Sequence, residues 1–180
     1  MNELAPRERV LLALSHRDTD RAPVDLIATR EAWGRLQHYM NIRDTDEVLR
    51  TLGVDLRHPR QSYVGPPLRR YPDGSWDDAW GVGRQAISHP GGGAYQEIVR
   101  HPLARIEDAA ELKEYPWPKP EWWDPDSLAE QIRTLDAERP YAIALPEFGD
   151  PGGIFEISWY MRGMEQFLMD LLSRPDIAHE

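Results

Sequence analysis

Apolar residues recur with helical spacing along much of the chain. The most regular stretch runs from Ile154 to Leu172, where they fall at positions i, i+3, i+4 and i+7. This spacing is typical of a helix with one buried face. Shorter stretches with the same spacing predict further helices at residues 7–16, 31–40, 46–52, 106–114 and 125–138. In the helix at 7–16 we expect Leu11 and Leu14 on the buried face and Arg9 outside it.

Short apolar runs predict strands at residues 22–27, 54–56 and 141–145. Trp76, Trp80 and Val82 precede a glycine-rich turn at residues 91–93, and further apolar residues follow that turn. We interpret this region, about residues 62–99, as a β-hairpin excursion inserted across the domain. The order of helices and strands indicates an α/β domain.

The predicted strand at 141–145 leads through a glycine-rich turn into the helix at residue 154, which is half of a βαβ unit. In α/β enzymes ligands bind at the carboxyl ends of such strands, and the free N–H groups at a helix start suit an anion. The alternative is a tight connection in which glycine only permits a positive φ. The absence of phosphate-loop spacing favours this alternative.

Composition excludes several classes of function. The net charge of −10 offers no basic stripe for a nucleic acid, and no apolar run is long enough to span a membrane. The amino terminus lacks the apolar core of a secretion signal, so we expect a cytoplasmic protein. The chain has no cysteine, which removes disulfides and thiolate ligands. Its histidines have no metal-ligand spacing, and we interpret them as solvated or capping residues.

Carboxylates at predicted strand ends are the clearest candidates for chemistry. Asp25, Asp55 and Glu147 each lie on or just past a predicted strand. In a βα barrel the carboxyl ends of the strands carry the catalytic residues. The alternative is that these carboxylates cap the following helix or are solvated.

Four stretches together resemble proteins of the uroporphyrinogen decarboxylase-like family. Residues 6–25, which end in Arg-Ala-Pro-Val-Asp, resemble the opening of these proteins. Residues 73–81, Asp-Gly-Ser-Trp-Asp-Asp-Ala-Trp-Gly, resemble a hairpin of the methyltransferase-like branch. Residues 102–118 and 152–172 are similar to the segments that follow, so the resemblance runs along the whole chain.

The resemblance implies a (β/α)₈ TIM barrel of which residues 1–180 form the N-terminal half, with the hairpin inserted and the C-terminal half absent. A complete barrel of this type needs about 250 residues. It also implies a small-molecule substrate. Relatives in the methyltransferase-like branch move a methyl group between a corrinoid and a thiol such as coenzyme M, or act on methoxylated substrates. A corrinoid protein is therefore a candidate partner.

These relatives use zinc held by His-x-Cys and a later Cys in their C-terminal half. We therefore expect this chain alone to bind no cofactor. The family's decarboxylases instead remove the acetate carboxyls of uroporphyrinogen in porphyrin biosynthesis, and an arginine-containing run after the first strand holds the substrate. Residues 26–32 contain only Arg30 in that place, which weighs against decarboxylation.

The resemblance also suggests roles for individual residues. Tyr160 matches a tyrosine that faces the cleft, and Asp55 matches an aspartate that stabilises a protonated pyrrole. We take these two as candidate catalytic residues. Arg162 stands where the decarboxylases carry an acidic residue. The candidate substrate contacts are Asp25, Glu147, Glu156 and Arg162.

Three hypotheses remain open at this point: a corrinoid-dependent methyltransferase, a uroporphyrinogen decarboxylase, and an inactive truncated half-barrel. The third leaves open whether the chain is an enzyme by itself. A half-barrel exposes unpaired strand edges and apolar faces, so we would expect it to aggregate or to form a homodimer.

Overall fold

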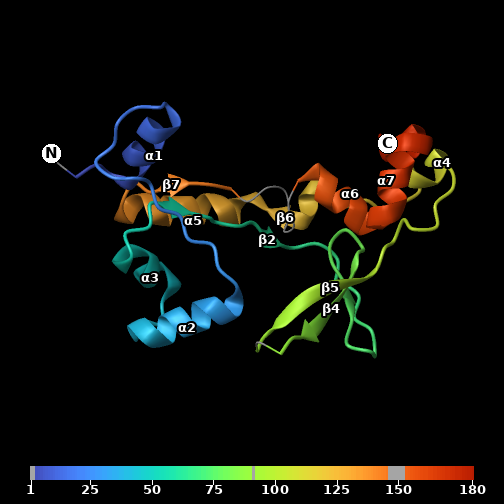
Figure 1. Cartoon of the computed structure of the whole chain (residues 1–180), viewed down its shortest axis with the longest axis horizontal. Coiled ribbons are helices and arrows are strands. Elements are labelled where there is room, and N and C mark those ends of the chain that lie inside the picture. The colour runs from blue at the N-terminus through green and yellow to red at the C-terminus, as the bar shows by residue number, and fades with distance from the viewer. Residues whose placement is uncertain (1–2, 91, 146–152) are drawn as a thin grey trace. The chain divides into compact units, whose positions relative to one another are not determined.

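The computed structural model of the chain describes residues 3–90, 92–145 and 153–180 (Figure 1). It is a mixed α/β structure with small sheets, none of which is closed among the described residues. The chain forms two compact units. Unit 1 comprises Met1–Ser62 and Asp124–Pro146, and unit 2 comprises Tyr63–Trp123 and Glu147–Glu180.

The helices of unit 1 confirm the helical predictions for its sequence. Each of α2, α3 and α5 begins where a side-chain oxygen accepts a hydrogen bond from a free backbone N–H: Thr29 for α2, Asp44 for α3 and Asp124 for α5. A proline stands in the first turn of α1 and of α5, where it disrupts no helical hydrogen bond. The bounds are Pro6–Leu14 (α1), Arg30–Met40 (α2), Thr45–Thr51 (α3) and Pro125–Glu138 (α5).

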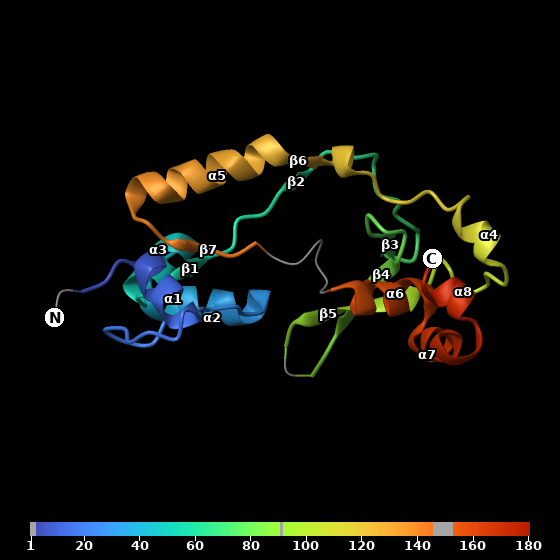
Figure 2. The same cartoon turned by 90° about the horizontal axis from the view of Figure 1, so that it is seen from above.

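A short parallel pair joins the two sequence segments of unit 1. Strand β1 (Leu56–Arg57) pairs with β7 (Ala142–Ile143), so that Leu56 lies opposite Ala142. Helix α1 lies beside β7 in Figures 1 and 2, and the Arg7 amide donates to the Pro140 carbonyl at 2.9 Å.

The strand predicted at residues 22–27 is wrong, because this segment forms no strand. Among the described residues, one backbone–backbone hydrogen bond joins it to the segment that enters β1, from the Asp55 amide to the Val24 carbonyl at 2.8 Å. The Val24 amide donates instead to the Asp55 side chain at 2.9 Å, and Pro23 has no N–H to donate. A ladder of backbone hydrogen bonds therefore does not develop.

The orientation predicted for α1 is also wrong. Leu11 and Leu14 are 56% and 72% exposed, whereas Arg9 is fully buried. Helix α1 buries a charged residue because that residue has carboxylate partners inside unit 1, which the helical spacing cannot reveal. Further buried residues of unit 1 include both apolar and charged side chains, among them Val48, Val54, Asp55, Arg57, Tyr141 and Ala142.

Unit 2 contains an antiparallel sheet in the order β3-β4-β5, which confirms the predicted hairpin. Strand β3 is Trp76–Asp77, β4 is Gly83–Ser88 and β5 is Ala94–Arg100. Ser88 pairs with Ala94 across the turn that the glycines predicted. The short strands β2 (Ser62–Tyr63) and β6 (Trp123–Asp124) pair with each other, separately from this sheet, and the boundary between the two units runs through both of them.

The single helix predicted between Ile154 and Leu172 is in fact two helices, α6 (Ile154–Arg162) and α7 (Met164–Ser173). Gly163 separates them with a φ of 92°, a backbone conformation that has no place in a right-handed helix. The remaining helices of the described chain are short: α4 (Ala109–Leu112), the 3₁₀ turn Pro120–Trp122 and α8 (Pro175–Ala178).

An apolar cluster forms the centre of unit 2. We refer to it as the unit 2 apolar cluster, and its buried members are Val82, Leu103, Leu112, Met161 and Ile177. Trp80, Tyr115 and Tyr160 pack against it from outside. None of the described helices combines the length and the apolar character needed to cross a membrane.

Candidate functional site

A groove of about 1030 Å³ lies in unit 1 at the carboxyl ends of its two parallel strands. Arg57 at the end of β1 and the residues after it, to Arg60, line one part of it, and Leu145 after β7 lines another. Because the strands are parallel, the segments that follow them leave the pair at the same end. The rest of the wall includes side chains of the segment before α2 and of helices α2, α3 and α5: Leu26, Ile27, Trp33, Leu49, Gln131 and Leu135.

A histidine and an aspartate meet at this groove. Nε2 of His58 lies 2.9 Å from Oδ1 and 3.0 Å from Oδ2 of Asp25. The side chains are 26% and 34% exposed, respectively. The carboxylate fixes the orientation of the imidazole, and Nδ1 makes no hydrogen bond with the described residues. A neutral imidazole held in this way can accept a proton from a ligand through Nδ1.

The neighbouring Arg57 is only 3% exposed and yet lines the groove. Its Nε donates to Asp46, and Nη1 donates to the carbonyl oxygens of Val54 at 3.0 Å and Leu56 at 2.9 Å. The guanidinium carbon lies 3.8 Å from the centre of the Tyr141 ring. Nη2 is buried and has no hydrogen-bond partner among the described residues.

Asp55, a predicted catalytic residue, does not line the groove. It precedes β1 and therefore lies at the opposite, amino end of the strand. Its carboxylate accepts hydrogen bonds from Arg9 Nη1 at 2.5 Å, Arg21 Nη1 at 2.6 Å and the Val24 amide at 2.9 Å. We call Arg9, Asp20, Arg21 and Asp55 the unit 1 ion cluster.

The electrostatics of this cluster keep its carboxylates ionised. Burial acts to raise the pKa of Asp55, but the hydrogen bonds from Arg21, the Val24 amide and Arg9 together outweigh burial and hold that pKa below the ordinary value. The hydrogen bond from Arg9 lowers the pKa of Asp20 more strongly still. The two ionised aspartates stabilise the buried guanidinium group of Arg9.

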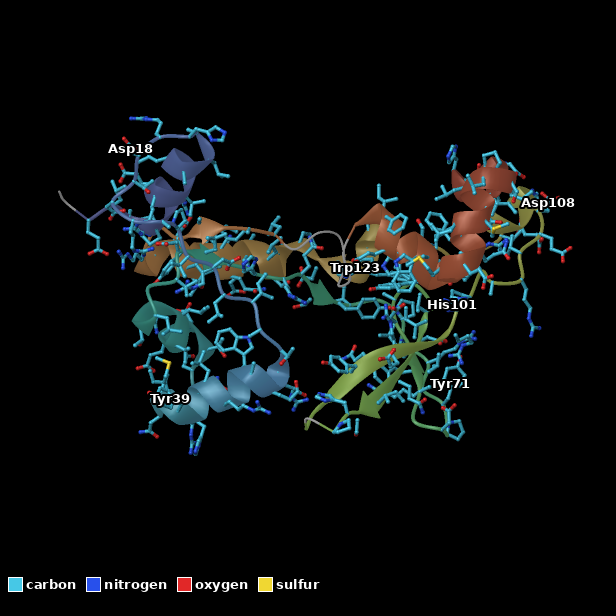
Figure 3. All side chains as sticks on the ribbon, viewed as in Figure 1. Asp18, Tyr39, Tyr71, His101, Asp108 and Trp123 are labelled. Carbon is cyan, nitrogen blue, oxygen red and sulfur yellow. The ribbon has the colours of Figure 1, made fainter. Side chains whose placement is uncertain are left out.

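The other predicted site residues belong to unit 2. The Tyr160 ring lies 4.7 Å from the Arg84 guanidinium carbon, and the Tyr160 carbonyl accepts a hydrogen bond from Nδ1 of His101 at 2.7 Å (His101 is labelled in Figure 3). Arg162 is buried and donates to Asp170 at 2.6 Å and to the Leu103 carbonyl at 2.5 Å. Glu156 is exposed in the first turn of α6.

Of the predicted substrate contacts that the structure describes, Asp25 is the one that lies beside a groove-lining residue, His58. Glu147 lies outside the described residues. The sequence interpretation missed His58 because it considered only metal-ligand spacing for histidines. His58 follows β1 directly, and the strand-end argument used for the carboxylates would have selected it had imidazoles been included.

The zinc site that the family resemblance implies does not fit the residues of this chain, which has no cysteine. In the described ranges, no three or more His, Asp or Glu residues gather as a metal would require. Comparison of the chain with models of known families, with curated proteins and with solved structures finds no match.

Proposed function

We propose that the chain forms the N-terminal half of a uroporphyrinogen decarboxylase-like (β/α)₈ barrel and takes part in corrinoid-dependent methyl transfer to a thiol or from a methoxylated substrate. The observation that carries this proposal is the groove at the carboxyl ends of the parallel strands β1 and β7. The resemblance of the four sequence stretches supplies the chemistry, and the groove supplies the place where the small-molecule substrate binds.

The position of the groove supports a barrel origin. In TIM barrels the active site is built from the segments that follow successive strands. Here the walls include residues 26–28, residues 57–60 and Leu145. Residues 57–60 lie at and after the end of β1, and Leu145 lies after β7, whereas residues 26–28 belong to the segment before α2 that forms no strand. Two of these three wall segments therefore lie at the carboxyl ends of strands.

His58 and Asp25 provide the acid–base function of the proposed site. The neutral imidazole accepts the proton of an acceptor thiol through Nδ1, and the Asp25 carboxylate stabilises the imidazolium that results. The sulfur then forms a bond to the methyl carbon of a methylcobamide substrate, whose cobalt keeps the electron pair of the broken bond. Asp25 thus acts as a positioning residue, and His58 acts on the substrate.

The second candidate is decarboxylation of a porphyrinogen, which one observation favours. Residues 26–32 lack the expected arginine run, but Arg57 and Arg60 bring guanidinium groups to the groove from another segment. Guanidinium groups are suited to hold a polycarboxylate. The Asp55 carboxylate, however, is occupied by the unit 1 ion cluster, so it would have to leave these partners to contact a pyrrole.

The test is thiol-dependent demethylation of methylcobalamin by the purified chain with coenzyme M, followed by the absorbance of the cobalamin. We expect a rate above that without protein, and a fall of about a hundredfold for His58→Gln because the proton acceptor is lost. Asp18→Asn, an exposed aspartate of unit 1 (Figure 3), should leave the rate unchanged. Release of carbon dioxide from uroporphyrinogen without demethylation would support the second candidate, and absence of both activities would contradict the proposal.

A further inference from the structure

We propose that the groove of unit 1 recognises an oxyanion of its ligand, a carboxylate or a phosphate group, through Nη2 of Arg57. The inference rests on the proposed function in placing a ligand in this groove, and it adds the chemical group by which the ligand is held. Its basis is a buried, immobilised guanidinium group that has hydrogen-bond donors to spare.

The orientation of the guanidinium group is set by the protein alone. Nε is held by Asp46, and Nη1 is held by the carbonyl oxygens of Val54 and Leu56. One face of the group lies against the Tyr141 ring at 3.8 Å. A ligand therefore does not need to order this side chain, and little conformational entropy is lost when it binds.

The decisive feature is the third nitrogen of the guanidinium group, Nη2. Buried polar groups in proteins nearly always have a hydrogen-bond partner, and one without a partner points to a missing ion, water or ligand. Nη2 of Arg57 is such a group among the described residues. Leaving a buried donor unpaired costs about 1–3 kcal/mol, and a ligand oxygen that accepts its hydrogen bond removes this cost.

The guanidinium groups at this wall favour an anion over a neutral acceptor, because a hydrogen bond between two charged groups is stronger than one to a neutral group. The Asp46 carboxylate is shared between Arg57 and Arg50, the latter at 2.8 Å. Two guanidinium groups thus share one carboxylate. Arg60 adds a further guanidinium group to the groove, and Glu130 on α5 is the other acidic residue of the lining.

Nη2 itself is covered from solvent, although other atoms of Arg57 border the groove. An entering oxygen therefore has to displace the atoms that cover Nη2. The ligand oxygen then accepts a charge-assisted hydrogen bond that is partly shielded from water. Such hydrogen bonds are among the stronger polar interactions in proteins.

The experiment is a titration of the full chain with succinate, inorganic phosphate and neutral acetamide in separate arms, observed by NMR at the arginine Nε–H signals and by calorimetry. We expect one of the two anions to bind saturably and to shift the Arg57 signal, while acetamide does not bind. The arm that saturates identifies the oxyanion as a carboxylate or a phosphate. Equal binding of acetamide, or an Arg57 signal that does not move at saturation, would overturn the inference.

Variants test the same residue independently. Arg57→Lys keeps the charge but lacks the second terminal nitrogen, so the anion should bind about tenfold more weakly or worse. Arg174→Gln removes an exposed guanidinium of unit 2 and should leave the affinity unchanged. Unchanged affinity in Arg57→Lys would reject the proposal. If that variant does not fold, the signals of the unmodified chain decide the question.

The test of the oxyanion site and the test of methyl transfer can give different results, so that each proposal can fail without the other. Anion binding at Arg57 without demethylation of methylcobalamin would reject methyl transfer and keep the oxyanion site. Demethylation without any anion binding at Arg57 would reject the oxyanion site and keep methyl transfer.

Discussion

Unit 1 and unit 2 differ in what they bury. At the centre of unit 1, Arg9 is fully buried and Asp55 is 1% exposed, and they face each other in an ion cluster. At the centre of unit 2, Val82 is fully buried and Met161 is 2% exposed, within an apolar cluster. Unit 2 also has a buried ion pair, Arg162 with Asp170, but this pair accompanies an apolar core.

This difference determines which substitutions destabilise each unit. A buried ion pair gains little net free energy over an apolar replacement, because both charges lose their hydration, but removal of one partner is severe. An apolar cluster gains stability in proportion to the area it hides and loses it when a cavity is opened. Unit 1 should therefore be sensitive to charge, and unit 2 to side-chain volume.

The largest expected effect is that of Asp55→Asn. The substitution leaves the buried Arg9 without one of its two carboxylates, and we expect the free energy of unfolding of unit 1 to fall by about 3–5 kcal/mol. Urea unfolding, observed by the NMR signals of each unit, measures it. Asp18→Asn makes the same chemical change at an exposed position and is the control. A loss as small as that of the control would show that the ion cluster is dispensable.

The corresponding substitution for unit 2 changes side-chain volume instead of charge: Leu112→Ala in the unit 2 apolar cluster. Leu112 is 5% exposed, and truncation of a buried leucine costs about 2–5 kcal/mol because a cavity remains. The same NMR-detected urea unfolding should show this loss in the signals of unit 2. Exposed Leu172 on α7, which is 84% exposed, is the matched position for a Leu→Ala control. Equal losses for the two leucines would contradict the assignment of the core.

Acid should unfold unit 1 preferentially. Asp20 and Asp55 have folded-state pKa values below the ordinary 3.8, so their ionised forms stabilise unit 1 above that pH. This contribution declines as the pH falls below about 4 toward the lower folded-state values. The depressed carboxylates of unit 2, Asp73 and Asp176, are exposed and should contribute less. An acid titration followed by NMR would contradict the comparison if unit 2 lost its signals first.

Alkali should produce a smaller effect, and in the other unit. Burial raises the pKa of Tyr115 to about 12, with the charges of Asp78 and Asp77 adding to it, and the hydroxyl donates to the Trp80 carbonyl at 2.6 Å. The stability that it gives is complete below the ordinary pKa of 10 and is lost as the pH rises through about 12. Tyrosinate absorbance, with Tyr115→Phe to identify the late-titrating group, measures this. Titration of every tyrosine near the ordinary value would count against it.

Local signals in the sequence predicted the elements that depend on local causes. Helix α2 follows from its apolar spacing, and the β4–β5 hairpin follows from its glycine turn. The break at Gly163 was missed because the apolar spacing continues across it. The segment at 22–27 failed as a strand because a strand requires a partner, and the partner segment supplied a side-chain carboxylate instead.

The site was less predictable because its contacts are distant in sequence. Asp25 could be selected from its place after an apolar run, but its partner His58 lies 33 residues away. Asp55 could be selected in the same way, whereas Arg9 and Arg21 lie 46 and 34 residues from it. No local pattern distinguishes an aspartate that binds a ligand from one that neutralises a distant arginine.

The pairing of β1 with β7 has a consequence for how the chain folds. Unit 1 closes through contacts such as that of Arg7 with the Tyr141 carbonyl, 134 residues apart, and unit 2 is likewise made of two separated segments. During synthesis Leu112 emerges long before Ile177, another buried member of the unit 2 apolar cluster. The groove of unit 1 likewise remains incomplete until β7 has been made. Closing such long loops is entropically costly and slow. The chain should therefore expose its apolar segments for much of its synthesis, which makes the nascent form a natural client for chaperones.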